Sequence, residues 1–591
     1  MENNNNNVNV FFACDNKFLK FTYITLKSIM ENANREHFYT FYVLNTDITE
    51  DSMSVSKEII NDYNNCRIEF VNVTNYLNEV KDRLPIRDYY SNATYYRLFI
   101  AEMFPDLDKV IYIDSDTIVK GDISKLYSIE LENNLVGACH EQAMVQNDIF
   151  GKYVNENLGL DRYNYFNAGL LLINCKLFRD EAILDQFTDL ISLYECKVTQ
   201  DEDYLNILCQ NRIKWVGDEW NTEIFGDIKI KEEDINVLHY IMWCKPWHFK
   251  GIQYEEYFWK YCEMTPFYDE VKEILAAYTD EQRKNDMARS KALEELAVKE
   301  TNAETKYVDV KQNRKSIDRL IVLKKIRDYE HQERFSEDVE QDPPTRPIEP
   351  GEVDYTRKKL KSKLKTRFAY FIARRYLNKI NRKKILIVKD IIGKENLAKL
   401  KTGAVLTCNH FNALDSFAME MAYESSVDRR KKKFYRVIRE GNYTSFPGFY
   451  GFLMRNCYTL PIATKPQAMK EFMKSTNELL ERGNFVLVYP EQSMWWNYKK
   501  PKPLKKGAFT FAVNSNVPVV PCFITMKDSD IVGTDGFKVQ EYTIHILEPI
   551  YPDPLKSKNE NINMLMDKNY ALWKDLYEKT YEKPLVYSSI R

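Results

Sequence analysis

A chain of 591 residues is too long for a single hydrophobic core, so we expect two or three domains. The formal net charge of -3 gives no indication of nucleic acid as a partner, and 44% hydrophobic residues suffice for each domain to bury a core. Eleven cysteines without a CxxC pair predict reduced thiols and a cytoplasmic setting. Residues 1–7 are polar, and no run reaches the roughly 18 apolar residues of a spanning helix. Any membrane contact, on the inner face of the cell membrane, is expected to be peripheral.

The first part of the chain alternates between strand and helix patterns. Buried strands are predicted at 8–13, 38–44, 68–73 and 110–113, and helices at 18–30 and 93–103. This alternation is typical of an α/β fold with a mostly parallel sheet, and it continues to about residue 275. We therefore predict a first domain over residues 1–275.

A charged segment follows this domain. Thr279 and Gln282 have the spacing of a capping box, and the residues from Asp280 to about Arg334 are predicted to be helical in large part. Four prolines between Pro343 and Pro350 break any helix. We predict a charged helical and proline-rich linker over residues 276–354, and a second α/β domain over residues 355–591.

The second domain opens with a basic segment, residues 357–384, that contains no acidic residue. Two interpretations of this segment stay open: an amphipathic helix that lies on an anionic bilayer, or a helix packed on the second domain with a solvated basic face. The apolar residues that recur in it at helical spacing are Leu360, Leu364, Phe368, Phe371 and Ile372.

The chain contains four Asp-x-Asp tripeptides, so the tripeptide alone is weak evidence. Asp114 and Asp116 differ from the others because they directly follow the apolar strand 110–113. Both carboxylates therefore stand at the C-terminal end of a strand, where open α/β sheets bind ligands. Two oxygen ligands suit Mg²⁺ or Mn²⁺, and a histidine as third ligand favours Mn²⁺. Such an ion would hold a diphosphate and neutralise a leaving group.

Residues 8 to about 265 resemble glycosyltransferase family 8, whose members are retaining enzymes with the GT-A fold. Six groups of residues match in order. They are Phe12-Ala13-Cys14-Asp15, Tyr95-Tyr96-Arg97-Leu98, Tyr112-Ile113-Asp114-Ser115-Asp116, Phe166-Asn167-Ala168-Gly169, Asp201-Glu202-Asp203, and His239-Tyr240 with Lys245-Pro246-Trp247.

The resemblance implies a Mn-dependent transfer from a UDP-hexose and a role for each matched residue. The family often has glutamine at the position of Glu202, and a carboxylate there can act as a nucleophile or stabilise an oxocarbenium-like centre. The implied metal ligands are Asp114, Asp116 and His239, and the implied reaction centre is Asp201 with Glu202. The implied contacts to the nucleotide sugar come from Ala13, Asp15, Arg97, Asn167, Ala168 and Lys245.

A second candidate site begins at His410, just after an apolar strand. Asp415 lies five positions further on, across a predicted strand-to-helix turn, so the two side chains can share a hydrogen bond. Asp415 would then orient the imidazole while its other nitrogen takes a proton from a hydroxyl. The arrangement corresponds to a catalytic triad that lacks the protein nucleophile, because the acceptor hydroxyl itself attacks a thioester.

Residues 385 to about 540 resemble the 1-acylglycerol-3-phosphate acyltransferase family. Asn409-His410 and Asp415 match its first motif, Gly451 to Arg455 its second, and Tyr489-Pro490-Glu491-Gln492-Ser493 its third. The resemblance implies that Arg455, Gln492 and Ser493 bind the acyl acceptor and that Glu491 lies near it. The family usually has Gly-Thr-Arg after the glutamate, and Met494 stands in place of that arginine. Loss of this phosphate partner predicts an acceptor other than a glycerol phosphate, such as a glycolipid hydroxyl.

Together these patterns predict a bifunctional transferase, a hexosyltransferase followed by an O-acyltransferase. The predicted partners are a UDP-sugar, acyl-CoA or acyl carrier protein, a lipid or glycolipid acceptor and an anionic membrane, with no nucleic acid. An alternative keeps the sugar transferase but makes the second domain a lipid-binding, membrane-docking module without turnover.

Overall fold

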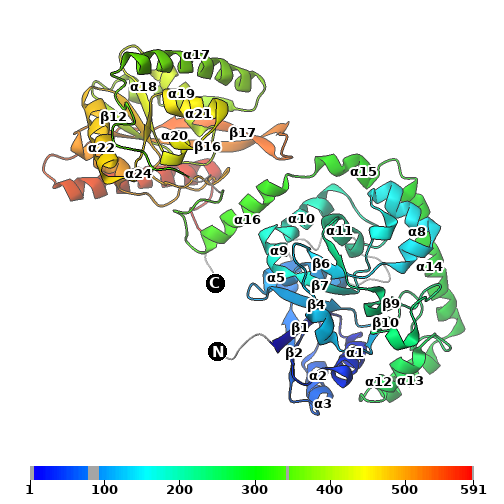
Figure 1. Cartoon of the computed structure of the whole chain (residues 1–591). Helices are drawn as coiled ribbons and strands as arrows, with labels where there is room; N and C mark the ends of the chain where they lie inside the picture. Colours follow the sequence, from blue (N-terminus) through cyan, green and yellow to red (C-terminus); the bar gives the residue numbers. More distant parts are fainter. Residues whose placement is uncertain (1–5, 78–91, 341–344, 589–591) are drawn as a thin grey trace. The chain divides into compact units, whose positions relative to one another are not determined.

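The computed structural model describes residues 6–77, 92–340 and 345–588. Most of the polar start (residues 1–5) and two of the predicted boundary prolines, Pro343 and Pro344, lie outside the described residues. The chain divides into two compact units, Met1–Leu320 and Ile321–Arg591, which are described separately (Figure 1). The division falls inside the segment 276–354.

The first unit is built on a seven-stranded sheet of order β3-β2-β1-β4-β7-β6-β8. The first four strands of that order are parallel, whereas β7 runs antiparallel to both of its neighbours. The predicted α/β class is confirmed. The strands are β1 (Asn7–Ala13), β2 (Phe38–Asn45), β3 (Cys66–Asn72), β4 (Lys109–Ile113), β6 (Val136–Ala138), β7 (Leu170–Asn174) and β8 (Ile213–Trp215).

Both faces of this sheet are buried, which explains the continuous apolar sequence of its strands. In β1, Val10 and Phe12 pack into one hydrophobic cluster, with α1 (Leu19–Asn32), while Phe11 packs into another cluster on the opposite face. The helix predicted at 93–103 is instead a tighter 3₁₀ segment, η3 (Asn92–Leu98), followed by the short helix α5 (Ile100–Met103).

A small second sheet of order β5-β10-β9 brings distant residues to the end of β4. Its strands are β5 (Thr117–Val119), β9 (Thr222–Glu223) and β10 (Val237–His239). Because β5 starts directly after Asp116 and pairs His239 with Thr117, the sheet places His239 beside the Asp-x-Asp turn.

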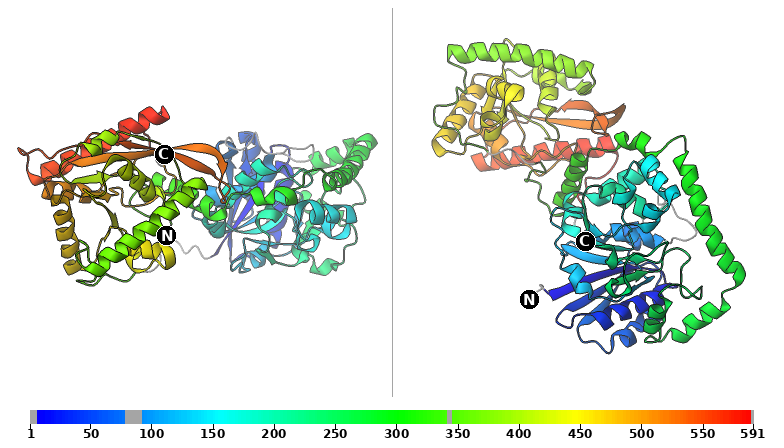
Figure 2. Two further views of the ribbon diagram at one scale, coloured as in Figure 1. Left: turned by 90° about the horizontal axis from the view of Figure 1, so that it is seen from above. Right: turned by 45° about the vertical axis from the view of Figure 1, so that its right-hand side comes forward.

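The charged segment is helical, as predicted. α14 (Asp280–Thr301) begins at Thr279 with the predicted capping box and runs beside α8 (Asp148–Tyr153) (Figures 1 and 2). α15 (Tyr307–Val310) and α16 (Ile317–His331) follow. Ala297 and Tyr307 belong to the core of the first unit. The first part of the predicted linker is therefore packed structure rather than a free tether.

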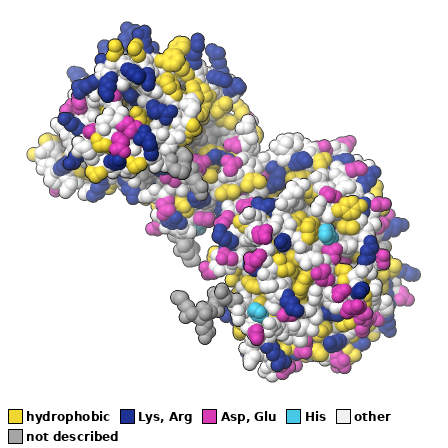
Figure 3. All heavy atoms as spheres, viewed as in Figure 1, with side chains coloured by type: hydrophobic (Ala, Val, Ile, Leu, Met, Phe, Trp, Pro, Cys, Tyr) yellow, Lys and Arg dark blue, Asp and Glu magenta, His cyan; other side chains and the backbone are white. Residues whose placement is uncertain are grey.

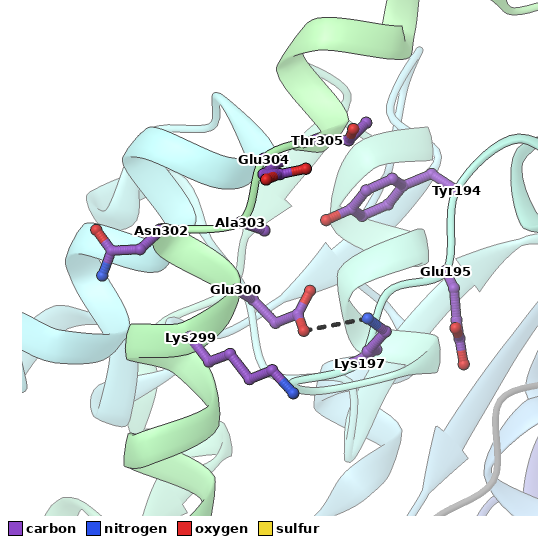
Figure 4. Close-up of a pocket in the computed structure, with 9 residues that line it drawn as sticks. All are labelled: Tyr194, Glu195, Lys197, Lys299, Glu300, Asn302, Ala303, Glu304 and Thr305. Atoms are coloured by element: carbon purple, nitrogen blue, oxygen red, sulfur yellow. Dashed lines mark hydrogen bonds and ion pairs between the residues drawn. The ribbon is translucent and has the colours of Figure 1, made fainter.

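A hollow lies near the C-terminal end of α14. It is lined by Lys299 and Glu300 of that helix, by residues 302–305 that follow it, and by Tyr194, Glu195 and Lys197 (Figure 4). Lys197 and Glu300 form an ion pair of 3.1 Å across it. None of the predicted site residues lines this hollow, so we interpret it as a junction between α14 and the rest of the first unit.

The second unit holds a seven-stranded sheet of order β11-β17-β16-β12-β15-β13-β14. Its pairs are parallel except for the antiparallel pair β16 and β17. The strands are β11 (Ile387–Ile392), β12 (Ala404–Thr407), β13 (Phe434–Ile438), β14 (Thr459–Pro461), β15 (Phe485–Val488), β16 (Val519–Val532) and β17 (Lys538–Ile546). The longer helices are α17 (Leu360–Arg382), α19 (Asp415–Ser426), α21 (Gly448–Asn456), α22 (Pro466–Glu481), α23 (Gly507–Asn514) and α24 (Lys558–Tyr581).

The basic segment forms α17, which lies along one side of this unit next to α21 (Figures 1 and 2). Its buried face consists of Thr366, Ala369, Leu377 and Ile380. The predicted apolar stripe is on the surface instead: the exposed fractions are 73% for Leu360, 61% for Leu364, 57% for Phe368 and 53% for Phe371. Among the described residues, no helix is both long enough and apolar enough to cross a bilayer.

Candidate active sites

The first candidate site lies at the C-terminal end of β4. Ligand atoms of Asp114, Asp116 and His239 all fall within 4.8 Å of one another. The Nε2 atom of His239 is 3.1 Å from Oδ1 of Asp116, and the hydroxyl of Tyr112 donates to Asp114 over 2.8 Å. The structure thus brings together the three residues predicted as metal ligands.

The tautomer of His239 suits a metal ligand. Its Nδ1 lies 3.0 Å from the side-chain oxygen of Asn221, and the amide nitrogen of Asn221 donates to Asn167 over 2.8 Å. The oxygen of Asn221 can therefore only accept, so Nδ1 donates to it, and Nε2 faces the aspartates as the atom that would bind a metal. Two carboxylates and one imidazole form a donor set that could hold a divalent metal ion.

A close backbone approach makes room for these ligands. A Cβ atom on Gly169 would stand 2.3 Å from Cε1 of His239 and 2.9 Å from Oδ2 of Asp114. The backbone N–H of Asp114 also donates to the carbonyl of Gly169 over 2.7 Å. Glycine is therefore required at this position by contact with the candidate ligands.

Two cations neutralise the aspartates. Lys245 donates to Asp116 and to the carbonyl of Tyr240. Arg97, which is 95% buried, contacts Asp114 at 3.3 Å and Asp201 at 3.1 Å and also donates to the carbonyl of Ala168. Burial raises the pKa of Asp116, but Lys245 and then His239 outweigh it and hold that pKa well below its usual range. The ion pairs thus keep Asp116 ionised and ready to bind a metal.

The predicted reaction centre is buried. Burial raises the pKa of Asp201 to about 6 although Arg97 opposes the shift. Burial, and then the Glu141 carboxylate, raise the pKa of Glu202 well above its ordinary value. One oxygen of Glu202 accepts the backbone N–H of Ala168 over 2.8 Å, so this carboxyl is held against the strand that carries Asn167.

Two glutamates that were not predicted join this centre. Glu141 accepts from the amide of Asn167 over 2.5 Å, and Glu223 is buried and accepts the backbone N–H of Gln142 over 3.0 Å. Burial, and then Glu141, raise the pKa of Glu223 well above its usual range. Neither glutamate lies in a recognisable sequence pattern, so only the β9–β10 pairing and the turn after β6 reveal them.

The other nucleotide-sugar residues lie at the ends of strands of the same sheet. Ala13 is the last residue of β1, and Asp15 follows it and accepts the backbone N–H of Phe18 over 2.9 Å. Asn167 and Ala168 lie just before β7, from which Gly169 alone separates them. The residues predicted to contact the nucleotide sugar therefore converge on one edge of the sheet.

The second candidate site lies at the C-terminal end of β12. Nδ1 of His410 is 2.7 Å from Oδ2 of Asp415, the first residue of α19. The hydroxyl of Tyr489 donates to the other oxygen of Asp415 over 2.7 Å, and its ring stacks on His410 at 4.1 Å. Asp415 is buried, whereas the His410 side chain is 23% exposed. The carboxylate therefore fixes Nδ1–H, and Nε2 remains able to take a proton.

Glu491 supports the backbone of this site. One carboxyl oxygen accepts the N–H of His410 over 3.0 Å, and the other accepts the N–H of Lys502 over 2.9 Å. The ammonium of Lys502 lies 3.5 Å from Glu491, and both residues are almost fully buried. Glu491 thus ties the turn that carries His410 to the third-motif loop, residues 489–494.

The predicted acceptor residues differ in accessibility. Arg455 donates to the carbonyls of Tyr443 and Phe446, each over 3.1 Å. Ser493 is fully buried and donates to the carbonyl of Phe335 over 2.6 Å. Gln492 is exposed, with a left-handed backbone (φ 68°). Of these three residues, Gln492 is exposed, Arg455 is partly buried and Ser493 is buried.

The chain matches two family models. Residues 9–251 match the model "Glycosyl transferase family 8", and residues 389–525 match the model "Acyltransferase". The matched ranges contain all of the residues predicted for the respective sites.

Curated relatives match the first of these regions. A putative glycosyltransferase of Haemophilus influenzae is 27% identical over 251 residues, which cover 41% of this chain and 74% of the relative. The lipopolysaccharide 1,3-galactosyltransferase of Salmonella typhimurium is 31% identical over 179 residues, which cover 28% of this chain and 53% of the relative.

Solved structures resemble each region separately. The galactosyltransferase LgtC in complex with donor and acceptor sugar analogues is 24% identical and has a TM-score of 0.38, over 44% of this chain and 96% of LgtC. The 1-acyl-sn-glycerophosphate acyltransferase PlsC of Thermotoga maritima is 19% identical and has a TM-score of 0.25, over 37% of this chain and 96% of PlsC.

Proposed function

We propose that this chain, which joins a glycosyl transferase family 8 domain to an acyltransferase domain, is a bifunctional enzyme that glycosylates and acylates glycolipid or surface-polymer precursors. In this proposal the first domain transfers a hexose from UDP-hexose with retention. The second moves an acyl chain from acyl-CoA or acyl carrier protein to a hydroxyl. The lipopolysaccharide galactosyltransferase among the relatives supports a hexose donor and a surface glycan as acceptor.

The convergence of Asp114, Asp116 and His239 carries the sugar-transfer part. A bound Mn²⁺ would neutralise the diphosphate leaving group. Lys245, next to Asp116, lies where it can add positive charge to that group. Glu202, held by the N–H of Ala168, is the carboxyl that would stabilise positive charge on the sugar in its ionised form.

The donor is tested directly with pure full-length protein, a panel of UDP-sugars and Mn²⁺. We expect UDP release or transfer with one UDP-hexose and none after thorough EDTA treatment. A chain that uses no UDP-sugar, or that is unaffected by EDTA, contradicts this part of the proposal.

The contact of His410 with Asp415 carries the acyl-transfer part. The partly exposed imidazole of His410 can accept the proton of an acceptor hydroxyl as that oxygen attacks the thioester carbonyl and the thiolate of the carrier leaves. The alternative, a docking module without turnover, is favoured by Met494 in place of the family arginine. A module of that kind needs neither the His410–Asp415 bond nor the bond from Tyr489 to Asp415.

The exposed stripe of α17 supports peripheral attachment to an anionic bilayer. Hydrophobic and basic side chains gather on the face of the second unit that carries this helix (Figure 3). Phe449 and Tyr450 of α21 extend the apolar surface, since Tyr376 of α17 contacts both rings. Attachment here would hold the second domain at the lipid surface where its substrates lie.

Neutralising the basic residues beside the stripe is expected to weaken liposome binding. Each contributes about 1 kcal/mol near an anionic surface, so replacing Lys358, Lys359, Lys361 and Lys363 by Gln should release the protein from anionic vesicles, most clearly at low salt. The measurement is co-sedimentation of the full chain with anionic and neutral vesicles.

The matched control is on α24. Replacing the exposed residues Lys558, Lys568, Lys574 and Lys579 by Gln removes the same charge from the surface of this helix and should leave binding unchanged. Equal sedimentation of the wild-type protein with anionic and neutral vesicles rules out the electrostatic part.

A further inference from the structure

A segment upstream of α17 covers the third-motif loop of the second unit. We call residues 335–339 the covering segment. The ring of Phe335 stacks on Trp495 at 5.6 Å, and the indole N–H of Trp495 donates to the carbonyl of Glu337 over 2.8 Å. Trp495 is fully buried, and Phe335 and Val339 are buried in the same cluster. The covering segment is therefore an integral part of the structure around the third-motif loop.

Arg439 lies where the covering segment meets this loop. It directly follows β13, and it donates to the carbonyl of Gln492 over 3.0 Å. β13 pairs in parallel with β15, and β15 pairs in parallel with β12, the strand that leads to His410. Arg439 and His410 thus follow strands that end at the same edge of the sheet, the edge at which α/β sheets bind ligands.

Asp338 of the covering segment forms an ion pair with Arg439. Its two carboxyl oxygens lie 2.7 Å from Nη2 and 2.5 Å from Nη1 of Arg439. One of these oxygens also accepts the backbone N–H of Met494 over 3.3 Å. The pair remains reachable from solvent, with side-chain exposures of 40% for Arg439 and 30% for Asp338. This two-point geometry is the one by which a guanidinium binds a phosphate group.

Two other cations near the site are also engaged within the chain. Arg455 donates to two backbone carbonyls, and Lys502 is buried against Glu491 and Ser493. Met494 supplies no charge where the family has arginine. A phosphate entering beside the third-motif loop would therefore meet the Asp338 carboxylate, which packing of Phe335 and Val339 holds in place. The negative charges of the Asp338 carboxylate and of the phosphate would repel each other and oppose binding.

We propose that Asp338 excludes phosphorylated acceptors from the acyltransferase site by occupying Arg439, so that the acyl acceptor is an uncharged hydroxyl compound such as a glycoside or an acylglycerol. This inference rests on the proposed acyl transfer and specifies its substrate class. It also agrees with a sugar transferase on the same chain, because hexosyl transfer adds an uncharged sugar that carries further hydroxyls.

The test compares two acceptors with the same acyl chain, monoacylglycerol and 1-acylglycerol 3-phosphate, on the full chain with acyl-CoA. Wild-type protein is expected to have the higher kcat/KM for monoacylglycerol. Asp338→Asn should raise kcat/KM for the phosphorylated acceptor on the order of tenfold and leave that for monoacylglycerol within about twofold. Adding Arg439→Gln to Asp338→Asn should abolish the gain.

Binding of glycerol 3-phosphate, measured by calorimetry, separates this inference from the proposed activity. Asp338→Asn should bind it on the order of tenfold more tightly than wild type even if no acyl transfer is seen. Glu424→Gln removes the same charge from an ion pair with Arg374 and should have no such effect. Unchanged affinity in Asp338→Asn, or a wild-type preference for the phosphorylated acceptor, overturns the inference.

Discussion

His410→Ala is expected to lower acyl transfer about 100- to 10,000-fold, the usual cost of removing a positioned general base. Sugar transfer should be unchanged, because His410 belongs to the second unit and the candidate metal site to the first. The measurement is a pair of assays on one preparation: radiolabelled acyl transfer to extracted glycolipid, and UDP release.

Asp415→Asn should lose acyl transfer by a related route. Its amide can donate to Nδ1 of His410 and stabilise the wrong tautomer, while the fold is kept because the side chain has the same size. His545→Ala is the matched control, since His545 lies in β17 and its ring nitrogen shares a hydrogen bond with the hydroxyl of Thr525. Wild-type rates in His410→Ala would remove this residue from the mechanism. An inactive wild-type chain would favour the membrane-docking alternative.

Asp116→Ala is expected to abolish sugar transfer and to leave acyl transfer intact. The change removes one candidate ligand and also the partner of both Lys245 and His239, so the site loses its metal affinity. Besides UDP release, the measurement is Mn²⁺ binding by calorimetry, which reports the site without turnover. Asp114→Ala should behave in the same way.

Metal affinity should also fall as the pH is lowered. Protons compete with the metal for His239 and the carboxylates. Because the pKa of Asp116 is depressed in the folded protein, its contribution to stability is present above its unfolded pKa and is lost as the pH falls through the folded value.

Asp106→Ala, a change at an exposed residue of another Asp-x-Asp tripeptide, is the control for Asp116→Ala. Unaltered Mn²⁺ binding in Asp116→Ala would contradict the metal assignment.

These two variants together test whether one chain carries two separate chemistries. Loss of acyl transfer alone in His410→Ala, and of sugar transfer alone in Asp116→Ala, is the pattern expected of independent sites. If either variant loses both activities, either one site serves both reactions or the variant is misfolded, and a thermal melt distinguishes these.

Local sequence was sufficient where the interacting residues are neighbours. The alternation of strand and helix patterns along the chain predicted the α/β class, because each pattern depends only on nearby positions. Thr279 and Gln282 predicted their capping box, and His410 and Asp415 their hydrogen bond, because one turn of backbone brings each pair together. The ends of β1, β4 and β12 were identifiable for the same reason.

Contacts between distant residues were decided only by the tertiary structure. Asn221, which orients His239, and Glu141, which contacts Asn167, carry no pattern of their own. The contact of Asp338 with Arg439 depends on the path of the covering segment over the third-motif loop. Strand order determines which loop ends meet, and no local preference encodes that order.

The basic helix α17 has features that its own sequence determines and others that the tertiary structure determines. Its sequence alone determined that a helix forms and that its apolar residues share a face. The tertiary structure of the second unit decided which face of this helix is buried. That face contains Ala369, Leu377 and Ile380. Leu364 and Phe368 are left exposed, because burial depends on which elements of the fold pack beside the helix and not on the helix sequence alone.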